Sequence, residues 1–321
     1  MKLPKFTKPY RLKDYNFTLV ILVFALSILG ILVIGSAKES YQGKQIIGLI
    51  LGIIIMVIVS LIDYVWILNF YVFLYAFAIL SLGAVLVIGE EVNGATRWID
   101  LGFTTFQPSE LAKILLILFF AKFLMDHEED VSDKMTIIKY AILSAIPLAL
   151  IVVEPNLSTT ICTALVICLM IYIAGLSYKF IGTVLLILIP ITVIFLGIVV
   201  QPDQKLLKDY QQKRILAFLE PEKYASDEAY QTKNSIMAIG SGQLTGKGLD
   251  NNTTTSVKNG NFILEPQIGF QSFINIGVTT GIIPNTGVPL PFVSYGLTSL
   301  VSLYIGIGFV LNVGLQPKKY Q

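Results

Sequence analysis

Long uncharged stretches alternate with short charged ones along the chain. A helix needs about 20 apolar residues to cross the roughly 30 Å hydrocarbon layer of a bilayer. Stretches of this kind predict seven membrane-spanning helices before residue 201: 17–35, 45–62, 66–89, 111–125, 136–153, 157–175 and 180–200. The fourth is short, and Lys122 near its end can extend its stem to the interface. The first stretch is too long, and too poor in a small-residue cleavage site, for a removable signal peptide, and further spans follow it, so we expect it to remain as an anchor.

The C-terminal part of the chain adds two more apolar stretches. Residues 266–317 include no charged side chain, and this stretch is long enough for spans near 268–283 and 298–315. The sequence therefore predicts an all-α fold, a polytopic membrane helical bundle with about nine apolar spans. We expect residues 1–321 to form a single membrane domain.

The charges between the spans predict which side each loop faces. Segment 1–14 carries five basic residues against Asp14 alone, so the positive-inside rule places it in the cytoplasm. Seven crossings then place residues 201–267 outside. Nine crossings would put Lys318 and Lys319 outside as well, against the rule. Three explanations stay open: the tail breaks the rule, residues 268–299 do not cross fully, or a span is missing.

Composition supports this class and excludes others. Hydrophobic residues make up 55% of the chain and charged residues 14%, against about a quarter charged in soluble domains. A net charge of +2 gives no footprint for nucleic acid, and continuous apolar runs do not fit a transmembrane β-barrel. The single histidine, His127, stands in an acidic loop with no thiol nearby, which cannot build a zinc site. We expect no cofactor, and we leave dependence on a divalent metal open.

Ionisable residues at the ends of spans are candidates for function, because charges at membrane depth are costly unless paired or hydrated. Arg97 is either an interfacial anchor beside Trp98 or a guanidinium for a phosphate group. Glu110 and Lys113 are three residues apart at the start of a helix, which predicts an ion pair. Glu154, followed by Pro155, is either a helix boundary or a carboxylate facing a cavity.

The predicted outer loop 201–267 has two notable segments. Residues 205–219 mix apolar side chains with charges that include Arg214, a composition typical of an interfacial amphipathic helix. Residues 240–248 are rich in glycine and contain Lys247, but Gly248 stands where a nucleotide-binding loop needs Ser or Thr. This segment is either a flexible loop or a turn that presents Lys247 to an anion. Glycines and prolines in 277–296 break the following helix, which favours a polar groove within the bundle.

These motifs together resemble the SEDS family, the RodA/FtsW/SpoVE group of bacterial membrane proteins, with RodA the most similar branch. The resemblance covers nearly the whole chain and rests on six segments: 93–98 (NGATRW), 107–113 (QPSELAK), 154–157 (EPNL), 212–214 (QKR), 246–249 (GKGL) and 273–296. It implies a ten-span fold with one long extracytoplasmic loop. It also implies a peptidoglycan glycosyltransferase that polymerises lipid II at the outer face of the cytoplasmic membrane, for elongation or division. The implied partner is a class B penicillin-binding protein, and undecaprenyl pyrophosphate is the leaving group.

The resemblance also implies roles for individual residues. Arg97, Arg214, Lys247 and the Glu110/Lys113 pair would surround a pyrophosphate, and Glu154 would belong to the same substrate-binding groove.

The chain departs from the family pattern after Gln267. In the family, this stretch continues into Thr-Asp-Phe, whose Asp is the expected catalytic carboxylate, and then into an eighth span. Here Ile268-Gly269-Phe270-Gln271 follows directly, and it resembles the start of the family's ninth span. The catalytic Asp and one helix are therefore missing, which agrees with the odd number of spans. Glu265 is the nearest remaining carboxylate and is only a weak candidate for the base.

Three functions remain under consideration. The first is a membrane glycosyltransferase. The second is a non-catalytic scaffold that binds lipid II or a penicillin-binding protein, and the missing Asp favours it over the first. The third is a transporter for a lipid-linked sugar, suggested by the broken helix and the intramembrane charges.

Overall fold

The structure, a computed structural model, describes residues 12–92, 95–102, 104–154, 156–178, 209–220 and 290–315, with scattered residues between 180 and 204 and between 236 and 241. It divides into two compact units, which are treated separately below. One unit is formed by Met1–Ala174 with Pro291–Gln321, and the other by Gly175–Leu290. The prediction of a single domain is not tested by this division.

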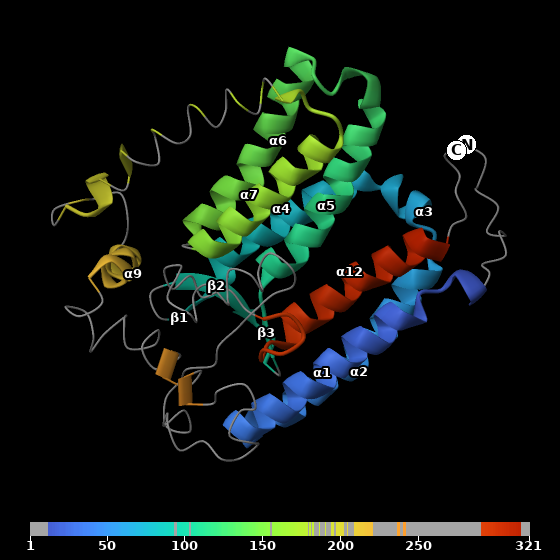
Figure 1. Ribbon diagram of the computed structural model, residues 1–321, viewed down its shortest axis with the longest axis vertical. Helices are drawn as coiled ribbons and strands as arrows, with labels where there is room; N and C mark the ends of the chain where they lie inside the picture. Colours follow the sequence, from blue (N-terminus) through green and yellow to red (C-terminus); the bar gives the residue numbers. More distant parts are fainter. Residues whose placement is uncertain are drawn as a thin grey trace. The chain divides into compact units, whose positions relative to one another are not determined.

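The first unit is built from seven long helices (Figure 1): α1 (Phe17–Ala37), α2 (Glu39–Leu61), α4 (Tyr71–Ile88), α5 (Pro108–Asp126), α6 (Lys134–Val153), α7 (Leu157–Ile173) and α12 (Leu297–Leu315). A short helix, α3 (Tyr64–Leu68), precedes α4, and short 3₁₀ turns lie at Leu12–Asp14 and Glu128–Asp130. Among the described residues, five of the helices are long and apolar enough to span a membrane: α1, α2, α4, α6 and α12. The predicted class, a helical membrane bundle, is confirmed.

Polar side chains set several helix boundaries. Asn16, Asp63, Asp133 and Asn156 each accept a hydrogen bond from a backbone N–H in the first turn of the helix that follows. Such caps satisfy N–H groups that have no partner inside the helix. Pro108 stands at the start of α5, where its missing N–H costs nothing.

The helices of this unit form two groups. In one group α12 packs along α2, and α1 packs on α2; in the other, α4, α5, α6 and α7 contact one another (Figure 1). Contacts between α5 and α12 join the two groups. Helix α12 is therefore packed between α1 and α2 on one side and the α4–α7 group on the other.

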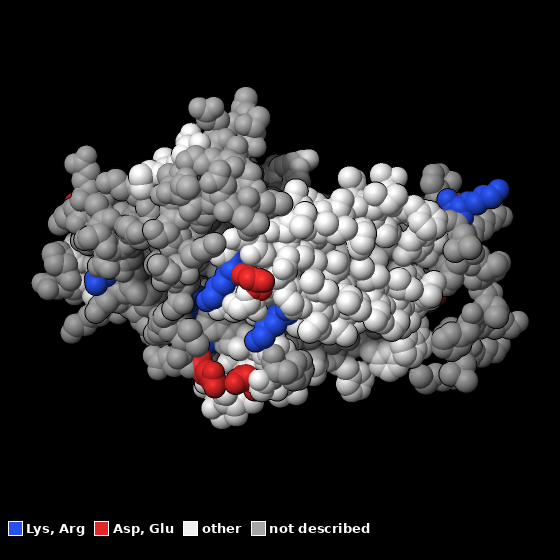
Figure 2. Space-filling view, turned by 90° about the horizontal axis from the view of Figure 1, so that it is seen from below, with Lys and Arg blue, Asp and Glu red and all other residues white. Residues whose placement is uncertain are grey.

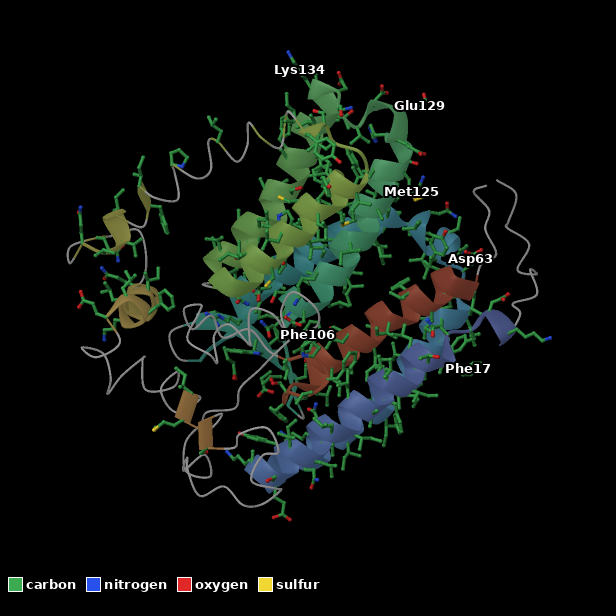
Figure 3. All side chains as sticks on the ribbon, in the orientation of Figure 1. Phe17, Asp63, Phe106, Met125, Glu129 and Lys134 are labelled. Carbon is green, nitrogen blue, oxygen red and sulfur yellow. The ribbon has the colours of Figure 1, made fainter. Side chains whose placement is uncertain are left out.

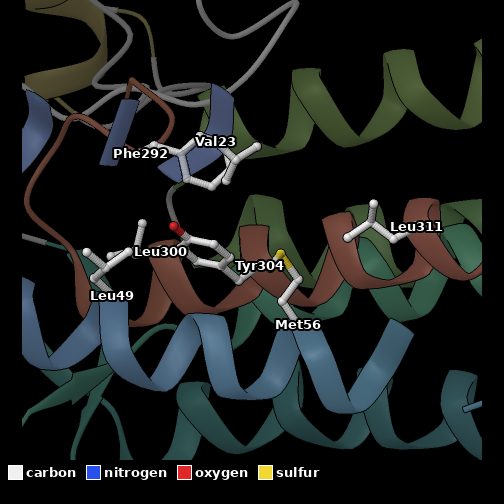
Figure 4. Close-up of a cluster of buried hydrophobic side chains, with 7 residues drawn as sticks. All are labelled: Val23, Leu49, Met56, Phe292, Leu300, Tyr304 and Leu311. Atoms are coloured by element: carbon white, nitrogen blue, oxygen red, sulfur yellow. The ribbon is translucent and has the colours of Figure 1, made fainter. Parts of the chain in front are cut away.

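Close contacts between α2 and α12 recur at a spacing of four residues along each helix. A Cβ at Gly52 would lie 2.9 Å from Cγ of Tyr304, and one at Gly308 would lie 2.9 Å from the carbonyl oxygen of Met56. Glycine at these two positions lets the helix backbones approach closely, as is common between membrane helices. Met56 and Tyr304 belong to a buried cluster that ties α1, α2 and α12 together: Val23, Leu49, Met56, Phe292, Leu300, Tyr304 and Leu311 (Figure 4).

Hydrogen bonds show that α12 runs parallel to α2 and antiparallel to α1. At the end of α12, Nδ2 of Asn312 donates to the carbonyl of Ser60 (2.7 Å), and Oδ1 accepts from the backbone N–H of Tyr64 (3.0 Å). The hydroxyl of Tyr15, just before α1, is hydrogen-bonded to the hydroxyl of Ser60 (3.3 Å). The end of α12 therefore lies beside the start of α1. We call this side of the unit the N-terminal end, and Phe17 and Asp63 mark it in Figure 3.

The direction of α12 corrects the count of nine full crossings. Since α12 finishes where α1 begins, an even number of crossings connects the two. Of the three explanations, the one in which the tail breaks the charge rule is not needed, because α12 ends on the side where α1 begins. The predicted span at 268–283 lies outside the described residues, and that at 180–200 is described only in part.

A short antiparallel sheet covers the opposite side, and the sequence pattern did not predict it. Strands β1 (Glu90–Val92), β2 (Ala95–Asp100) and β3 (Thr105–Phe106) pair in the order β1-β2-β3, with Glu90 opposite Trp98 and Ile99 opposite Phe106. The sheet connects α4 to α5. We call this side of the unit the hairpin end; Phe106 marks it in Figure 3.

Candidate functional site

The predicted ion pair between Glu110 and Lys113 is present at the start of α5. The Lys113 Nζ atom lies 2.8 Å from Oε1 of Glu110, and the two side chains are 15% and 3% exposed. Both residues belong to the first two turns of the helix, where the carboxylate also interacts favourably with the positive end of the helix dipole. A buried carboxylate is thus neutralised by a cation that keeps some access to solvent.

The second carboxylate oxygen of Glu110 is held by α12. Ser299 Oγ donates to Oε2 of Glu110 at 3.1 Å, across 189 residues of sequence. The neighbouring Thr298 Oγ1 donates to the carbonyl of Thr105 in β3 at 2.8 Å. Two adjacent residues of α12 therefore connect this helix to α5 and to the sheet. Sequence reasoning missed Ser299, because nothing local links residues so far apart.

Glu154 lies in the turn between α6 and α7 and is fully buried. Among the described residues, neither of its carboxylate oxygens has a hydrogen-bond partner. Burial raises the pKa of this carboxyl to about 8, and the positive charge of Arg97 on β2 opposes the rise. The guanidinium of Arg97 is therefore close enough to act on Glu154, which brings together two residues that are 57 positions apart in the chain.

The loop before α12 is fastened by a buried amide that sequence reasoning also missed. Gln45 on α2 is fully buried, and its Nε2 donates to the carbonyl of Ser294 (2.9 Å) while its Oε1 accepts from the N–H of Gly296 (3.3 Å). Tyr295 stacks on Tyr41, with ring centroids 4.4 Å apart. The signal in the sequence that could have revealed Gln45 is its place as a polar residue inside an apolar span, because a buried amide needs hydrogen-bond partners.

The other predicted site residues are less fully described. Arg214 lies in α9 (Asp209–Leu219), a helix of the second unit that forms where the amphipathic pattern predicted one, but its side chain is outside the described residues. Lys247 and Glu265 also lie outside them. Across the described part of the chain, no cluster of three or more His, Cys, Asp or Glu side chains is suited to hold a metal ion.

The arrangement defines an integral membrane protein with a polar site at one end of an otherwise apolar bundle. Figure 2 shows how sparse the charged side chains are on one face of the described surface. Arg97, the Glu110/Lys113 pair and Glu154 come from the sheet, from α5 and from the α6–α7 turn, and all lie at the hairpin end. Partly accessible cations beside buried carboxyls can bind an anionic group, and a carboxyl of raised pKa can exchange a proton near neutral pH.

Comparison with known proteins identifies the family. Residues 14–264 and 261–319 match the family of FtsW, RodA and SpoVE, described as cell cycle proteins. The chain belongs to this family, as its motifs predicted.

Individual relatives agree with this assignment. The chain is 30% identical to the peptidoglycan glycosyltransferase MrdB of Escherichia coli, over 94% of each chain. It is 28% identical to a probable peptidoglycan glycosyltransferase FtsW of Coxiella burnetii, over 95% of this chain and 97% of that protein.

Two solved structures share the fold. A chain from a peptidoglycan synthase complex that coordinates polymerization and crosslinking has a TM-score of 0.73 and 27% identity, with 94% of this chain and 97% of that chain covered. The rod-shape-determining protein RodA of Thermus thermophilus has a TM-score of 0.64 and 26% identity, with 95% and 98% covered.

The family match also bears on the predicted gap. It is split into two parts that meet at residues 261–264, a few residues before the predicted gap after Gln267. The alignment with MrdB extends over 357 positions, more than the 321 residues of this chain. Both observations support a segment in the relatives that this chain lacks.

Proposed function

We propose that this protein binds lipid II through its pyrophosphate at the hairpin end and takes part in peptidoglycan glycosyl transfer. The observation that carries the proposal is the convergence of Arg97, Glu110, Lys113 and Glu154 at one end of a membrane bundle. Relatives at 28–30% identity over nearly the whole chain are named peptidoglycan glycosyltransferases, which supports the same substrate class.

The hairpin end would face the outside of the bacterial cytoplasmic membrane. The N-terminal end is continuous with segment 1–14, which carries five basic residues against one acidic residue, so the positive-inside rule favours the cytoplasm for it. Lipid II is polymerised on the outer surface, where the hairpin end would then meet the headgroup. The orientation supports the proposed substrate because both assign the polar site to the same leaflet.

In the proposed reaction, the 4-hydroxyl of one lipid II attacks the anomeric carbon of a second glycan. The new glycosidic bond forms as the bond to undecaprenyl pyrophosphate breaks, and a carboxylate accepts the hydroxyl proton. Arg97 and Lys113 would stabilise the charge that develops on the departing pyrophosphate, and Arg214 and Lys247 would add to this cation set. This chemistry needs no cofactor, and loss of activity in EDTA would reveal a divalent metal.

We further propose a class B penicillin-binding protein as the partner. The similar chain from a complex that coordinates polymerization and crosslinking supports this choice, since crosslinking is a separate activity from polymerisation.

The missing segment favours a second candidate, a scaffold that binds lipid II and the partner without polymerising. In the family this segment supplies the expected catalytic Asp. Without it, the proton acceptor would have to be another carboxylate, and Glu265 is the nearest in sequence.

One experiment separates the candidates. The purified chain, with its partner and lipid II, is assayed for glycan strands, and binding of lipid II in nanodiscs is measured in parallel. Strands refute the scaffold, and their loss in Glu265→Ala supports Glu265 as a replacement base. Binding without strands supports the scaffold, whereas no binding refutes both. Movement of lipid II across liposomes without polymerisation would support the transporter instead.

A further inference from the structure

The first turn of α12 connects three separate parts of the first unit. Gln45 of α2 holds the loop at Ser294 and Gly296, just before the helix begins. Within the helix, Thr298 reaches β3 and Ser299 reaches Glu110 of α5. The position of Ser299 is therefore fixed from two other elements, independently of its bond to Glu110.

The two carboxylate oxygens of Glu110 have different partners. Oε1 pairs with Lys113, and Oε2 accepts the hydroxyl of Ser299. At 3% exposure this carboxylate has little water to replace a lost donor, and a buried acceptor left without a donor is costly. Without Ser299, the carboxylate would turn both oxygens toward Lys113, which is the more exposed of the pair.

We propose that Ser299 is a positioning residue for the anion site: its hydroxyl holds one oxygen of Glu110, so that the Lys113 ammonium stays directed toward the pyrophosphate of a lipid-linked sugar. The proposal rests on the proposed function, because it assumes that Lys113 meets this ligand. It assigns Ser299 a role that acts through Glu110 and not through contact with the ligand.

The test measures binding of undecaprenyl pyrophosphate to the full chain in nanodiscs. Ser299→Ala is expected to weaken binding about five- to tenfold, the equivalent of one hydrogen bond to a charged group. Ser299→Thr, which keeps the hydroxyl, is expected to restore it. Ser302→Ala is the matched control, since Ser302 is a buried serine one turn later on the same helix, and binding should not change.

A double-mutant cycle distinguishes positioning from a general structural effect. In the Glu110→Gln background, Ser299→Ala should weaken binding less than twofold further, because the carboxylate through which Ser299 acts has gone. Additive losses would overturn the proposal, as would unchanged binding by Ser299→Ala while the wild type binds. If the wild type does not bind, the proposed function fails, and the role of Ser299 at this site fails with it.

Discussion

Replacement of Gly30 by alanine tests the close approach of α1 to the loop that precedes α12. An added Cβ would overlap the carbonyl oxygen of Phe292 and would lie 2.7 Å from Cα of Val293. Carbon atoms in favourable contact are about 3.5–4.0 Å apart, so the two backbones would have to separate by roughly 1 Å. Both obstacles are main-chain atoms and cannot rotate away. Overpacking of this kind costs about 1–3 kcal/mol, while alanine regains about 1 kcal/mol of helix propensity.

The net loss of stability for Gly30→Ala relative to wild type is therefore about 0–2 kcal/mol, or up to roughly 6 °C in apparent Tm, and the loss relative to a variant with the same gain in propensity is about 1–3 kcal/mol. Thermal unfolding of the purified protein in detergent measures it. Gly83→Ala in α4 is the matched control, because a Cβ there meets nothing within 4 Å and only the gain in propensity remains. The reasoning is refuted if Gly30→Ala is as stable as Gly83→Ala.

Three further predictions concern buried polar groups. Because burial raises the pKa of Glu154 to about 8, the folded state binds its proton more tightly than the unfolded state, so wild-type stability should fall from about pH 4.5 to pH 8. Glu154→Gln should flatten this decline, and equal pH slopes of Tm in the two proteins would contradict the cause given. Lys113→Met should destabilise the protein by about 3–5 kcal/mol by leaving the Glu110 carboxylate without its cation, and a second change, Glu110→Gln, should recover most of that loss in thermal unfolding. Ser27 Oγ and Tyr304 Oη lie 2.8 Å apart, and a double-mutant cycle of Ser27→Ala and Tyr304→Phe should give a coupling of only about 0.6 kcal/mol, as for other hydrogen bonds between membrane helices; a value above about 2 kcal/mol would show that this pair is unusual.

Local patterns predicted the spans well. The stretch 17–35 became α1 (Phe17–Ala37), and 111–125 became α5 (Pro108–Asp126), extended at its start by the proline and the charged turn. The Glu110/Lys113 pair followed from helical spacing alone. The three short strands were missed because residues 90–106 have no extended alternation of apolar and polar side chains.

The contacts that complete the site depend on long-range packing, which no local pattern shows. Ser299 is hydrogen-bonded to a residue 189 positions away, and Gln45 to one 249 positions away. Both were missed, although each is a polar group in an uncharged stretch that needs partners, because the sequence does not say which partners they have. The odd number of spans, by contrast, could be resolved only from the direction of α12.

The parallel packing of α12 on α2 has a consequence for biosynthesis. The partners that the structure gives Gln45 are Ser294 and Gly296, which the ribosome makes almost 250 residues later. Helices α1 and α2 therefore enter the bilayer long before the amide of Gln45 can form its hydrogen bonds to Ser294 and Gly296. During that interval the amide of Gln45 must find other hydrogen-bond partners, and the arrival of α12 supplies the ones present in the folded protein.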